Sequence, residues 1–325
     1  MIWNHYIYDH AGRLLKEYNQ IEGDTGNGRV LLTRNEYNES GELITKKLHA
    51  TNTQETNYLQ EVDYRYNIRG WLKTINDPTT VSTTGDLFGM ELLYDTINDL
   101  TSLTAENQYN GNISAIKWQG AYHQILSAYG FTYDGVNRIT GADYGTNNGS
   151  GWTDETTKYN VYGLVYDKNG NIGTLKRDGS TNQIDALTYT YRGNQLMEVE
   201  DHATGTSTAG FTDGTNQDSD YVYDENGNLV GDKNKGIDLI TYNELNLPEQ
   251  IVMGNDTIYY LYDANGTKLG KEVVDNGTVS TRWYVGGIVF KDANIDYIMT
   301  TEGRIVNQGG SYQYEYFLKD HLGNT

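Results

Sequence analysis

One stretch decides the fold of this chain, and it reads Tyr223-Asp224-Glu225-Asn226-Gly227-Asn228-Leu229. It follows Tyr221-Val222, and because residues two apart share a face of a strand, both rings lie on one side. Asp224 then takes the first position of a type I turn, where its carboxylate can accept a backbone N–H. Gly227 takes the fourth position, where a positive φ costs glycine nothing. Leu229 begins a return strand, so the stretch predicts a β-hairpin whose short loop can include a glycine bulge.

The same phrase recurs along nearly the whole chain. Each copy has Tyr followed by a turn that is rich in Asp, Asn and Gly, and most copies then have an aliphatic residue. The copies are about 20 to 33 residues apart, a spacing typical of stacked supersecondary units but too irregular for a solenoid with one fixed rung length. The clearest copies contain Tyr8, Asp9 and Gly12; Tyr166, Asp167 and Gly170; Tyr223, Asp224 and Gly227; and Tyr262, Asp263 and Gly266. Looser copies contain Tyr37 and Gly41; Tyr66 and Gly70; Tyr133 and Asp134; Tyr191; and Tyr242.

The repeat predicts an all-β protein. A lone hairpin is marginal in water, so the copies must pair with their neighbours into a long antiparallel strip. We expect tyrosine rings to stack along one face of this strip, each with its hydroxyl reaching water or a turn. Composition agrees, because the 325 residues include 29 Tyr and 37 Gly against 5 Phe and 2 Pro, so tyrosine is expected to carry much of the burial.

Charge and cysteine content restrict the function. A net charge of −20 argues against binding of nucleic acid or of an anionic membrane surface. The chain has no Cys, which excludes disulfides, a thiolate nucleophile and Cys-based zinc sites. No apolar run reaches the length of a membrane span, and the first residues lack the basic start and apolar stretch of a signal peptide. We expect the intact protein to be secreted or at the cell surface, exported by a signal that lies elsewhere.

The repeated phrase resembles the YD repeat of RHS proteins, a group that includes bacterial polymorphic toxins, the C component of insecticidal Tc toxins and the animal teneurins. One copy would be weak support, whereas about a dozen across the chain are specific. Residues 88–118 look like an insert of RHS proteins from Bacteroidetes-type bacteria. Residues 316–325, with Asp320, His321 and Gly323, look like the segment that opens the RHS-repeat-associated core region.

This resemblance implies a strip of hairpins that spirals into part of a hollow shell. In toxin members the shell encloses a variable C-terminal effector, and an Asp-bearing segment that follows the region where this chain stops cuts the effector free. The expected organisation is one RHS domain, with YD hairpins at 1–76, an atypical insert at 77–130, YD hairpins at 131–315 and the start of the core segment at 316–325. The chain is expected to be a fragment and a non-catalytic scaffold whose partner is that effector.

No catalytic, cofactor or metal site is predicted. The Asp224 turn superficially resembles a calcium loop, but an EF-hand needs Gly at its sixth position and Glu at its twelfth. The six His residues are scattered, without an HExxH motif. Asp320 and His321 are adjacent, which on a strand points them to opposite faces, so they are interpreted as part of a turn motif and not of a triad.

Two alternatives stay open. Rows of Tyr and Trp can stack on sugars, so a surface repeat protein that binds carbohydrate or a neighbouring cell is the second hypothesis. An enzyme remains conceivable only as an unusual autoprotease. The segments 77–85, 145–158 and 204–220 are rich in Thr, Ser, Gly, Asn and Asp, and we expect them to be long exposed connections between hairpins.

Overall fold

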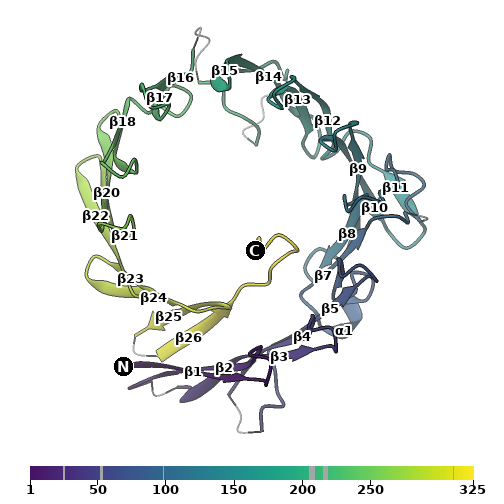
Figure 1. Ribbon diagram of the computed structural model, residues 1–325, viewed down its shortest axis with the longest axis vertical. Coiled ribbons are helices and arrows are strands. Elements are labelled where there is room, and N and C mark those ends of the chain that lie inside the picture. Colours follow the sequence, from purple (N-terminus) through teal and green to yellow (C-terminus); the bar gives the residue numbers. More distant parts are fainter. Residues whose placement is uncertain (25, 52–53, 98, 205–208, 215–218, 310) are drawn as a thin grey trace. The chain divides into compact units, whose positions relative to one another are not determined.

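The computed structural model describes residues 1–24, 26–51, 54–97, 99–204, 209–214, 219–309 and 311–325. Within these residues, antiparallel strands joined by tight turns make up almost all of the regular structure, with one short helix (Figure 1). The predicted all-β class and the predicted strip of antiparallel hairpins are therefore confirmed. The chain divides into two compact units, one of residues 1–137, 142–156 and 300–325, the other of residues 138–141 and 157–299.

The first unit contains most of the N-terminal strands and the last hairpin. Each strand from β1 to β9 is paired with the next along the chain, β10 pairs with β11, and β25 pairs with β26. The elements are β1 (Ile2–Tyr8), β2 (Leu14–Ile21), β3 (Arg29–Tyr37), β4 (Leu43–Ala50), β5 (Gln60–Tyr66), β6 (Leu72–Ile75), α1 (Val81–Thr84), β7 (Phe88–Leu93), β8 (Ala115–Gly120), β9 (Leu126–Tyr133), the larger part of β10 (Ile139–Asn147), β11 (Trp152–Asp154), β25 (Gly303–Gln308) and β26 (Ser311–Tyr316).

The second unit repeats the same scheme. Strands β12 to β15, β16 and β17, and β18 to β24 are each paired with their sequence neighbours. The elements are β12 (Val161–Tyr166), β13 (Ile172–Asp178), β14 (Gln183–Arg192), β15 (Gln195–Asp201), β16 (Tyr221–Tyr223), β17 (Leu229–Asp232), β18 (Leu239–Tyr242), β19 (Pro248–Met253), β20 (Asp256–Tyr262), β21 (Lys268–Asp275), β22 (Thr278–Val285), β23 (Ile288–Lys291) and β24 (Asn294–Met299).

A shift of strand register occurs next to the repeated tyrosine. In β16 and β17, Val222 is opposite Gly231 but Tyr223 is opposite Leu229, so one residue of the return strand is left over. This is the bulge that a glycine turn can introduce, and it increases the local twist. The same shift occurs before Tyr8, Tyr37, Tyr66, Tyr166, Tyr191, Tyr242 and Tyr262.

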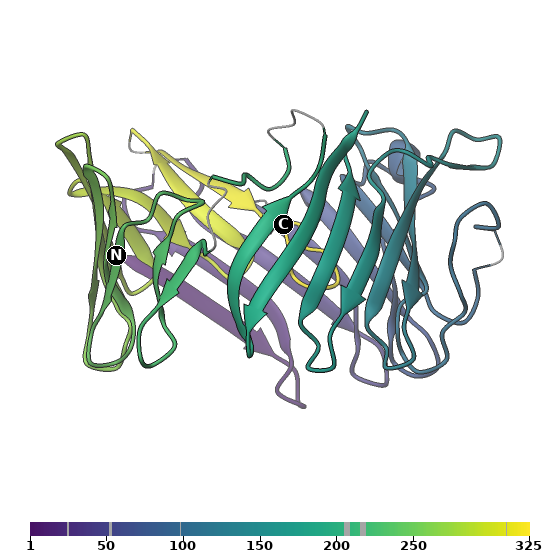
Figure 2. The ribbon, with the colours of Figure 1, turned by 90° about the horizontal axis from the view of Figure 1, so that it is seen from above.

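The main core of the first unit lies where its C-terminal residues cover strands β4 to β7. Buried Leu48, Val62 and Met90 belong to one cluster, and Tyr316 and Leu318 pack against it. Figures 1 and 2 both show the yellow C-terminal hairpin along the purple N-terminal strands. Burial of apolar side chains of this size stabilises a fold by roughly 1.5–3 kcal/mol each.

Polar contacts fix the position of this hairpin. The Lys46 ammonium donates to both carboxylate oxygens of Glu302, at 2.8 and 2.9 Å. The Tyr314 hydroxyl donates to Asn19 Oδ1 at 2.8 Å, and the Tyr316 hydroxyl lies 3.0 Å from His49 Nδ1. These contacts join residues more than 250 positions apart, so no local sequence pattern predicts them.

Two expectations about burial are wrong in part. Segment 77–85 is not simply an exposed connection, because Pro78 is fully buried and Val81, the first residue of α1, is 1% exposed. The repeated tyrosines are mostly half-buried, and Tyr8 is 55% exposed, because a strip of hairpins covers each ring on one side only. The buried hydrophobic residues of the described part are instead mainly aliphatic.

The other two segments expected to be connections differ from one another. Residues 152–154 of the segment 145–158 form β11, which pairs with β10. Parts of segment 204–220 lie outside the described residues, but Asp220 at its end is fully buried and its Oδ2 accepts the Val199 N–H at 2.8 Å. The short helix of the described part is not of the length and hydropathy that a membrane crossing would need.

The packing around α1 predicts the effect of one glycine substitution. A Cβ on buried Gly89 would lie 2.8 Å from the Pro78 backbone and 2.8 Å from Val81 Cγ2. We expect Gly89→Ala to lower the free energy of unfolding by about 1–3 kcal/mol, the usual cost of overpacking, as measured by urea denaturation. Gly135→Ala is the matched control, because nothing lies within 4 Å of its added Cβ. Equal stability of the two variants would contradict this packing.

Candidate functional site

The aspartate of the repeated phrase closes its own turn. In the β16–β17 hairpin, Asp224 Oδ1 accepts the backbone N–H groups of Asn226 at 2.9 Å and of Asn228 at 2.8 Å. Its Oδ2 accepts the Asn228 side-chain amide at 2.9 Å. The Gly227 N–H donates to the Asp224 carbonyl at 3.1 Å, and Gly227 has a φ of 85°, where a residue with a Cβ would be strained. One side chain and one glycine therefore hold the whole loop.

The same set of contacts recurs along the chain. The carboxylate or amide oxygen at the first turn position accepts two backbone N–H groups, from the residues two and four positions later. This holds for Asp9, Asn67, Asp167, Asn243, Asp263 and Asp320. Asp134 accepts such a bond from Val136. The predicted turn glycines Gly12, Gly41, Gly70, Gly170, Gly227, Gly266 and Gly323 all have positive φ.

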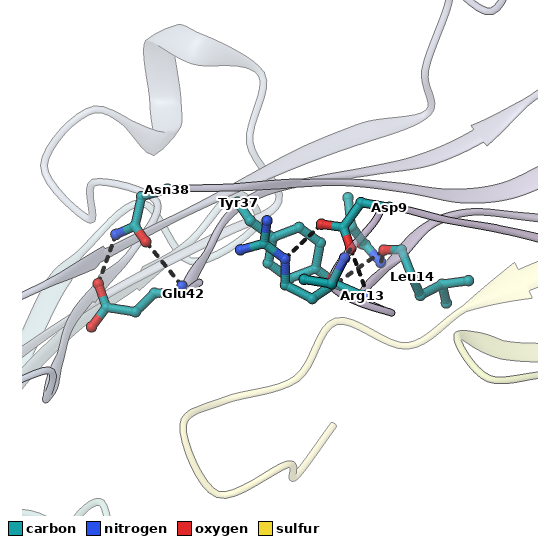
Figure 3. Close-up of polar contacts among 8 residues, drawn as sticks. Asp9, Arg13, Leu14, Tyr37, Asn38 and Glu42 are labelled. Atoms are coloured by element: carbon teal, nitrogen blue, oxygen red, sulfur yellow. Dashed lines mark hydrogen bonds and ion pairs between the residues drawn. The ribbon is translucent and has the colours of Figure 1, made fainter. Parts of the chain in front are cut away.

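Neighbouring turns have the same geometry, although the side chain at the first position accepts a side-chain hydrogen bond in one turn and donates one in the next (Figure 3). In the first turn, Arg13 Nε donates to Asp9 Oδ2 at 2.7 Å. In the next, the side-chain amide of Asn38 donates to Glu42 Oε2 at 2.7 Å, while its Oδ1 accepts the Glu42 N–H at 2.9 Å. The turn thus tolerates acid or amide at its first position, because both offer an oxygen to the backbone.

Hydrogen bonds lower the pKa of the turn aspartates. The pKa of Asp224 lies below its ordinary value because the Asn228 side chain and the turn N–H groups donate to the carboxylate. The pKa of Asp167 is lowered in the same way by Asn171. For Asp9 and Asp263 the largest cause is a backbone N–H, from Arg13 and Thr267 respectively. These carboxylates stay ionised as acceptors, which is the state that the turn uses.

The tyrosine of the phrase binds the preceding hairpin. The Tyr223 hydroxyl donates to the Leu196 carbonyl at 2.8 Å, and the Tyr242 hydroxyl donates to the Leu229 carbonyl at 2.7 Å. The acceptor is the aliphatic residue that ends the previous copy. We call these bonds the tyrosine ladder, and its other members are Tyr37 to Leu14, Tyr66 to Leu43, Tyr94 to Leu72, Tyr133 to Ile113, Tyr166 to Ile139 and Tyr191 to Ile172.

Sequence reasoning missed one member of the ladder. Tyr94 makes the same bond as the repeated tyrosines, at 2.9 Å, although it lies in the predicted insert. The sequence feature that could have identified Tyr94 is the pair Tyr94-Asp95, which lies about one repeat length after Tyr66. No glycine follows at the turn position, because the chain instead runs through a longer connection before β8.

Adjacent turns also contact each other through amide side chains. Asn169 and Asn171 donate to Asn194 Oδ1 at 3.1 and 3.2 Å. Asn228 and Asn246 exchange two bonds, at 2.6 and 2.9 Å. Arginines add to this edge, since Arg13 lies over the Tyr37 ring at 4.9 Å and Arg138 over the Tyr166 ring at 4.4 Å. At these positions, neighbouring hairpins contact each other at their turns, and this includes β16–β17 and β18–β19, which belong to separate sheets.

Tyr8, Tyr262 and the Asp320 turn are predicted features that lie outside the tyrosine ladder. Tyr8 ends the exposed strand β1, and the Tyr262 ring packs beside Tyr260 with centroids 6.4 Å apart. The Asp320 carboxylate accepts hydrogen bonds from Leu322 and Asn324 of its own turn. Within the described residues, no group of three or more His, Asp or Glu side chains is arranged to hold a metal ion.

Comparison with known proteins identifies the fold. No protein-family model and no curated protein matches the sequence. The crystal structure of TcdB2-TccC3-Cdc42 has a similar fold, with a TM-score of 0.53 and 13% identity over 94% of this chain and 15% of that chain. A Photorhabdus luminescens Tc holotoxin pore matches over 95% of this chain and 20% of that chain, at 14% identity and a TM-score of 0.28, too low to support an argument. The chain thus has the fold of a small part of a much longer protein.

The tyrosine ladder predicts a hydroxyl-specific effect on stability. Tyr133→Phe removes the bond of 2.7 Å to the Ile113 carbonyl and keeps the ring. We expect a loss of about 0.5–1.5 kcal/mol in the free energy of unfolding, measured by urea denaturation. Tyr122→Phe is the control, because Tyr122 is 95% exposed. If both variants match the unmodified chain, the hydroxyl bonds contribute nothing to stability.

The turn aspartates predict a pH dependence. The folded pKa of Asp224 is below the ordinary 3.8, so its contribution to stability is complete above that pH and is lost as the pH falls through the folded value. Asp224→Asn keeps an acceptor oxygen, as Asn243 does in its own turn, but cannot titrate. Between about pH 5.5 and about pH 2.5, the urea midpoint should therefore fall more for the unmodified chain than for this variant.

The control for that comparison is Glu225→Gln in the same turn. The Glu225 side chain is exposed and makes no hydrogen bond to a described residue, so its replacement should leave the pH profile as it is. A constant difference between Asp224→Asn and the unmodified chain across the whole pH range would refute the role of the ionised carboxylate.

Proposed function

We propose that this chain is part of an RHS/YD-repeat shell, a structural scaffold that encloses or presents an effector encoded downstream. The observation that carries the proposal is the tyrosine ladder. It uses the first and last residues of the repeated phrase to join successive hairpins from β1–β2 to β18–β19, and its members lie in both compact units. The similarity of fold to part of the TcdB2-TccC3-Cdc42 structure supports the same function.

The physical basis of a scaffold is the local character of these contacts. The hairpins of the ladder are held by their own turns, by the pairing of their two strands and by the hydroxyl bond to the preceding hairpin, so a strip grows by adding copies. Such a strip can extend into a wall without a large central core, which suits a chain that is only 37% hydrophobic. By analogy with RHS toxins, the wall would surround cargo and exclude the outside.

The proposed function is non-catalytic. The motif carboxylates accept bonds from their own turns and have lowered pKa values, whereas a general acid or base is best tuned towards the working pH. We further propose that the intact protein is secreted or surface-exposed and comes from a Bacteroidetes-type RHS family. The expected segments 1–76, 77–130, 131–315 and 316–325 remain predictions of the same kind.

The first test is to follow the reading frame beyond codon 325 and to express the complete protein. We expect the frame to continue into an Asp-bearing core segment and an unrelated tail. In limited proteolysis of the complete protein, that tail should resist cleavage as long as the repeat region is folded. It should become sensitive in parallel with unfolding of the repeat region in urea.

The outcomes of this test are distinct. A stop codon directly after residue 325, or a tail that is cleaved as readily as the same tail expressed alone, would overturn encapsulation. The proposal of a non-catalytic chain has its own measurement, which is prolonged incubation of the purified chain followed by intact-mass spectrometry. Self-cleavage at a defined bond would show that the chain is an autoprotease.

A further inference from the structure

A row of basic side chains crosses neighbouring strands of the second unit. Strands β20 to β23 pair in sequence order (Figure 1). Lys271 of β21 is opposite Arg282 of β22, which in turn is opposite Lys291 of β23. Tyr260 of β20 ends the row beside Lys271. Residues directly opposite in adjacent strands share a face, with Cβ atoms about 4.5–5.5 Å apart, so three cations follow one another on one face of the sheet.

A fourth cation, Lys268, lies on the same face. It is opposite Tyr262, the tyrosine of the repeated phrase, and Tyr260 lies two residues before Tyr262 on that face. Lys268 Nζ is 5.0 Å from the centre of the Tyr260 ring and 5.8 Å from the centre of the Tyr284 ring. These cation–π contacts hold the ammonium in place, but they leave its charge without a counterion.

Most of the positive charge on this face is unpaired. Arg282 Nη2 lies 3.3 Å from Asp296 Oδ2, in a pair that is partly exposed. In the part of the chain that the structure describes, Lys268, Lys271 and Lys291 make no ion pair with a carboxylate. Lys268, Arg282 and Lys291 are exposed and Lys271 is half-buried, so all four can be reached by a ligand. We call these four residues the basic patch.

The basic patch contrasts with the composition of the chain. The chain has 24 Lys and Arg against 44 Asp and Glu, and its net charge is −20. Like charges that are directly opposite in adjacent strands destabilise a sheet, so the patch opposes the stability of the free chain. The tyrosine ladder does not account for it, because the last bond of the ladder joins β18–β19 to the preceding hairpin. A negatively charged ligand would relieve the repulsion.

We propose that the basic patch, made of Lys268, Lys271, Arg282 and Lys291, binds an acidic segment of another polypeptide. Carboxylates of such a segment would accept charge-assisted hydrogen bonds from the ammonium groups and from the Arg282 guanidinium. In an extended segment, side chains on one face are about 7 Å apart, whereas neighbouring strands of the sheet are about 4.8 Å apart. The flexible four-carbon stems of the lysines can make up this difference.

Other anions fit less well. Single-stranded nucleic acid binds through bases that stack on open aromatic faces. The Tyr260 and Tyr284 rings are half-buried and lie next to Lys268, so they do not offer an open stacking platform. The net charge of −20 also repels a ligand with the charge density of nucleic acid. A lone phosphate would leave part of the row unpaired, because the row spans three strands and roughly 10 Å.

The test is fluorescence anisotropy of a labelled decapeptide of alternating Glu and Ser, titrated with the full chain in about 20 mM salt, where charges are weakly screened. We expect saturable binding that weakens as the salt is raised to about 300 mM, and no binding of the matching Gln-Ser decapeptide. Lys271→Gln combined with Lys291→Gln should weaken binding about tenfold, because it removes two exposed ion pairs of roughly threefold each.

The matched control is Lys168→Gln combined with Lys235→Gln. Both lysines are exposed in turns outside the basic patch, and the double variant changes the net charge by the same amount. It should leave the affinity for the Glu-Ser decapeptide unchanged. Equal weakening by the two double variants would show that the peptide responds only to total charge, which would overturn the site.

Urea denaturation separates a binding role from a structural one. Because the like charges repel one another in the free chain, Lys271→Gln combined with Lys291→Gln should keep the urea midpoint or raise it. A lower midpoint would show that the two lysines stabilise the fold, and it would contradict a patch whose charge is met by a ligand.

Three further results would also overturn the proposal. The first is an absence of binding of the Glu-Ser decapeptide. The second is tighter binding of decathymidylate, which would assign the patch to nucleic acid. The third is displacement of the decapeptide by inorganic phosphate at constant ionic strength, which would assign the patch to a small anion. None of these outcomes depends on whether the shell proposal holds, because they are measured on the isolated chain.

Discussion

The bond from a tyrosine hydroxyl to the carbonyl of the preceding hairpin is the interaction on which the rest of this structure depends. Two-stranded hairpins are marginal alone, and this chain has few large buried side chains to hold them together. Near a bulge the regular strand bonds are interrupted, and a hydroxyl on a long rigid ring can reach a carbonyl there. Phenylalanine has the ring without the donor, which gives a physical reason for 29 Tyr against 5 Phe.

The turns account for a part of the acidic composition. Asp9, Asp167, Asp224, Asp263 and Asp320 each close a turn by accepting two backbone N–H groups through one oxygen. In each of these turns the carboxylate fixes the conformation of the backbone. Where an amide takes the place, as at Asn67 and Asn243, the geometry is unchanged, so the position selects an acceptor oxygen and not a charge.

The two faces of the strip carry different kinds of side chain. The face of the repeated tyrosines binds neighbouring hairpins, and in the first unit it packs against Tyr316 and Leu318 of the C-terminal residues. In the second unit, the opposite face presents Tyr259, Leu261 and Trp283, all substantially exposed. A strip built in this way uses one face for its own assembly, whereas the other presents exposed side chains to solvent.

The sequence by itself determined the hairpins, their turns and the all-β class, because Tyr-Asp-x-x-Gly encodes a local geometry of five residues. Asp224 and Gly227 could be assigned roles from their spacing alone. The partner of each tyrosine hydroxyl could not, since Tyr223 and Leu196 meet only when two hairpins pair. Tyr94 was missed because a long connection hides its turn, although its place in the strip gives it the same bond.

Only the tertiary structure decided the contacts between distant segments. The ion pair of Lys46 with Glu302, the covering of β4 to β7 by C-terminal residues and the burial of Pro78 and Val81 arise from packing. The row of Lys271, Arg282 and Lys291 depends on strand register, which fixes cross-strand neighbours that the sequence does not place side by side. Local turns follow from local chemistry, whereas a surface is set by which strands meet.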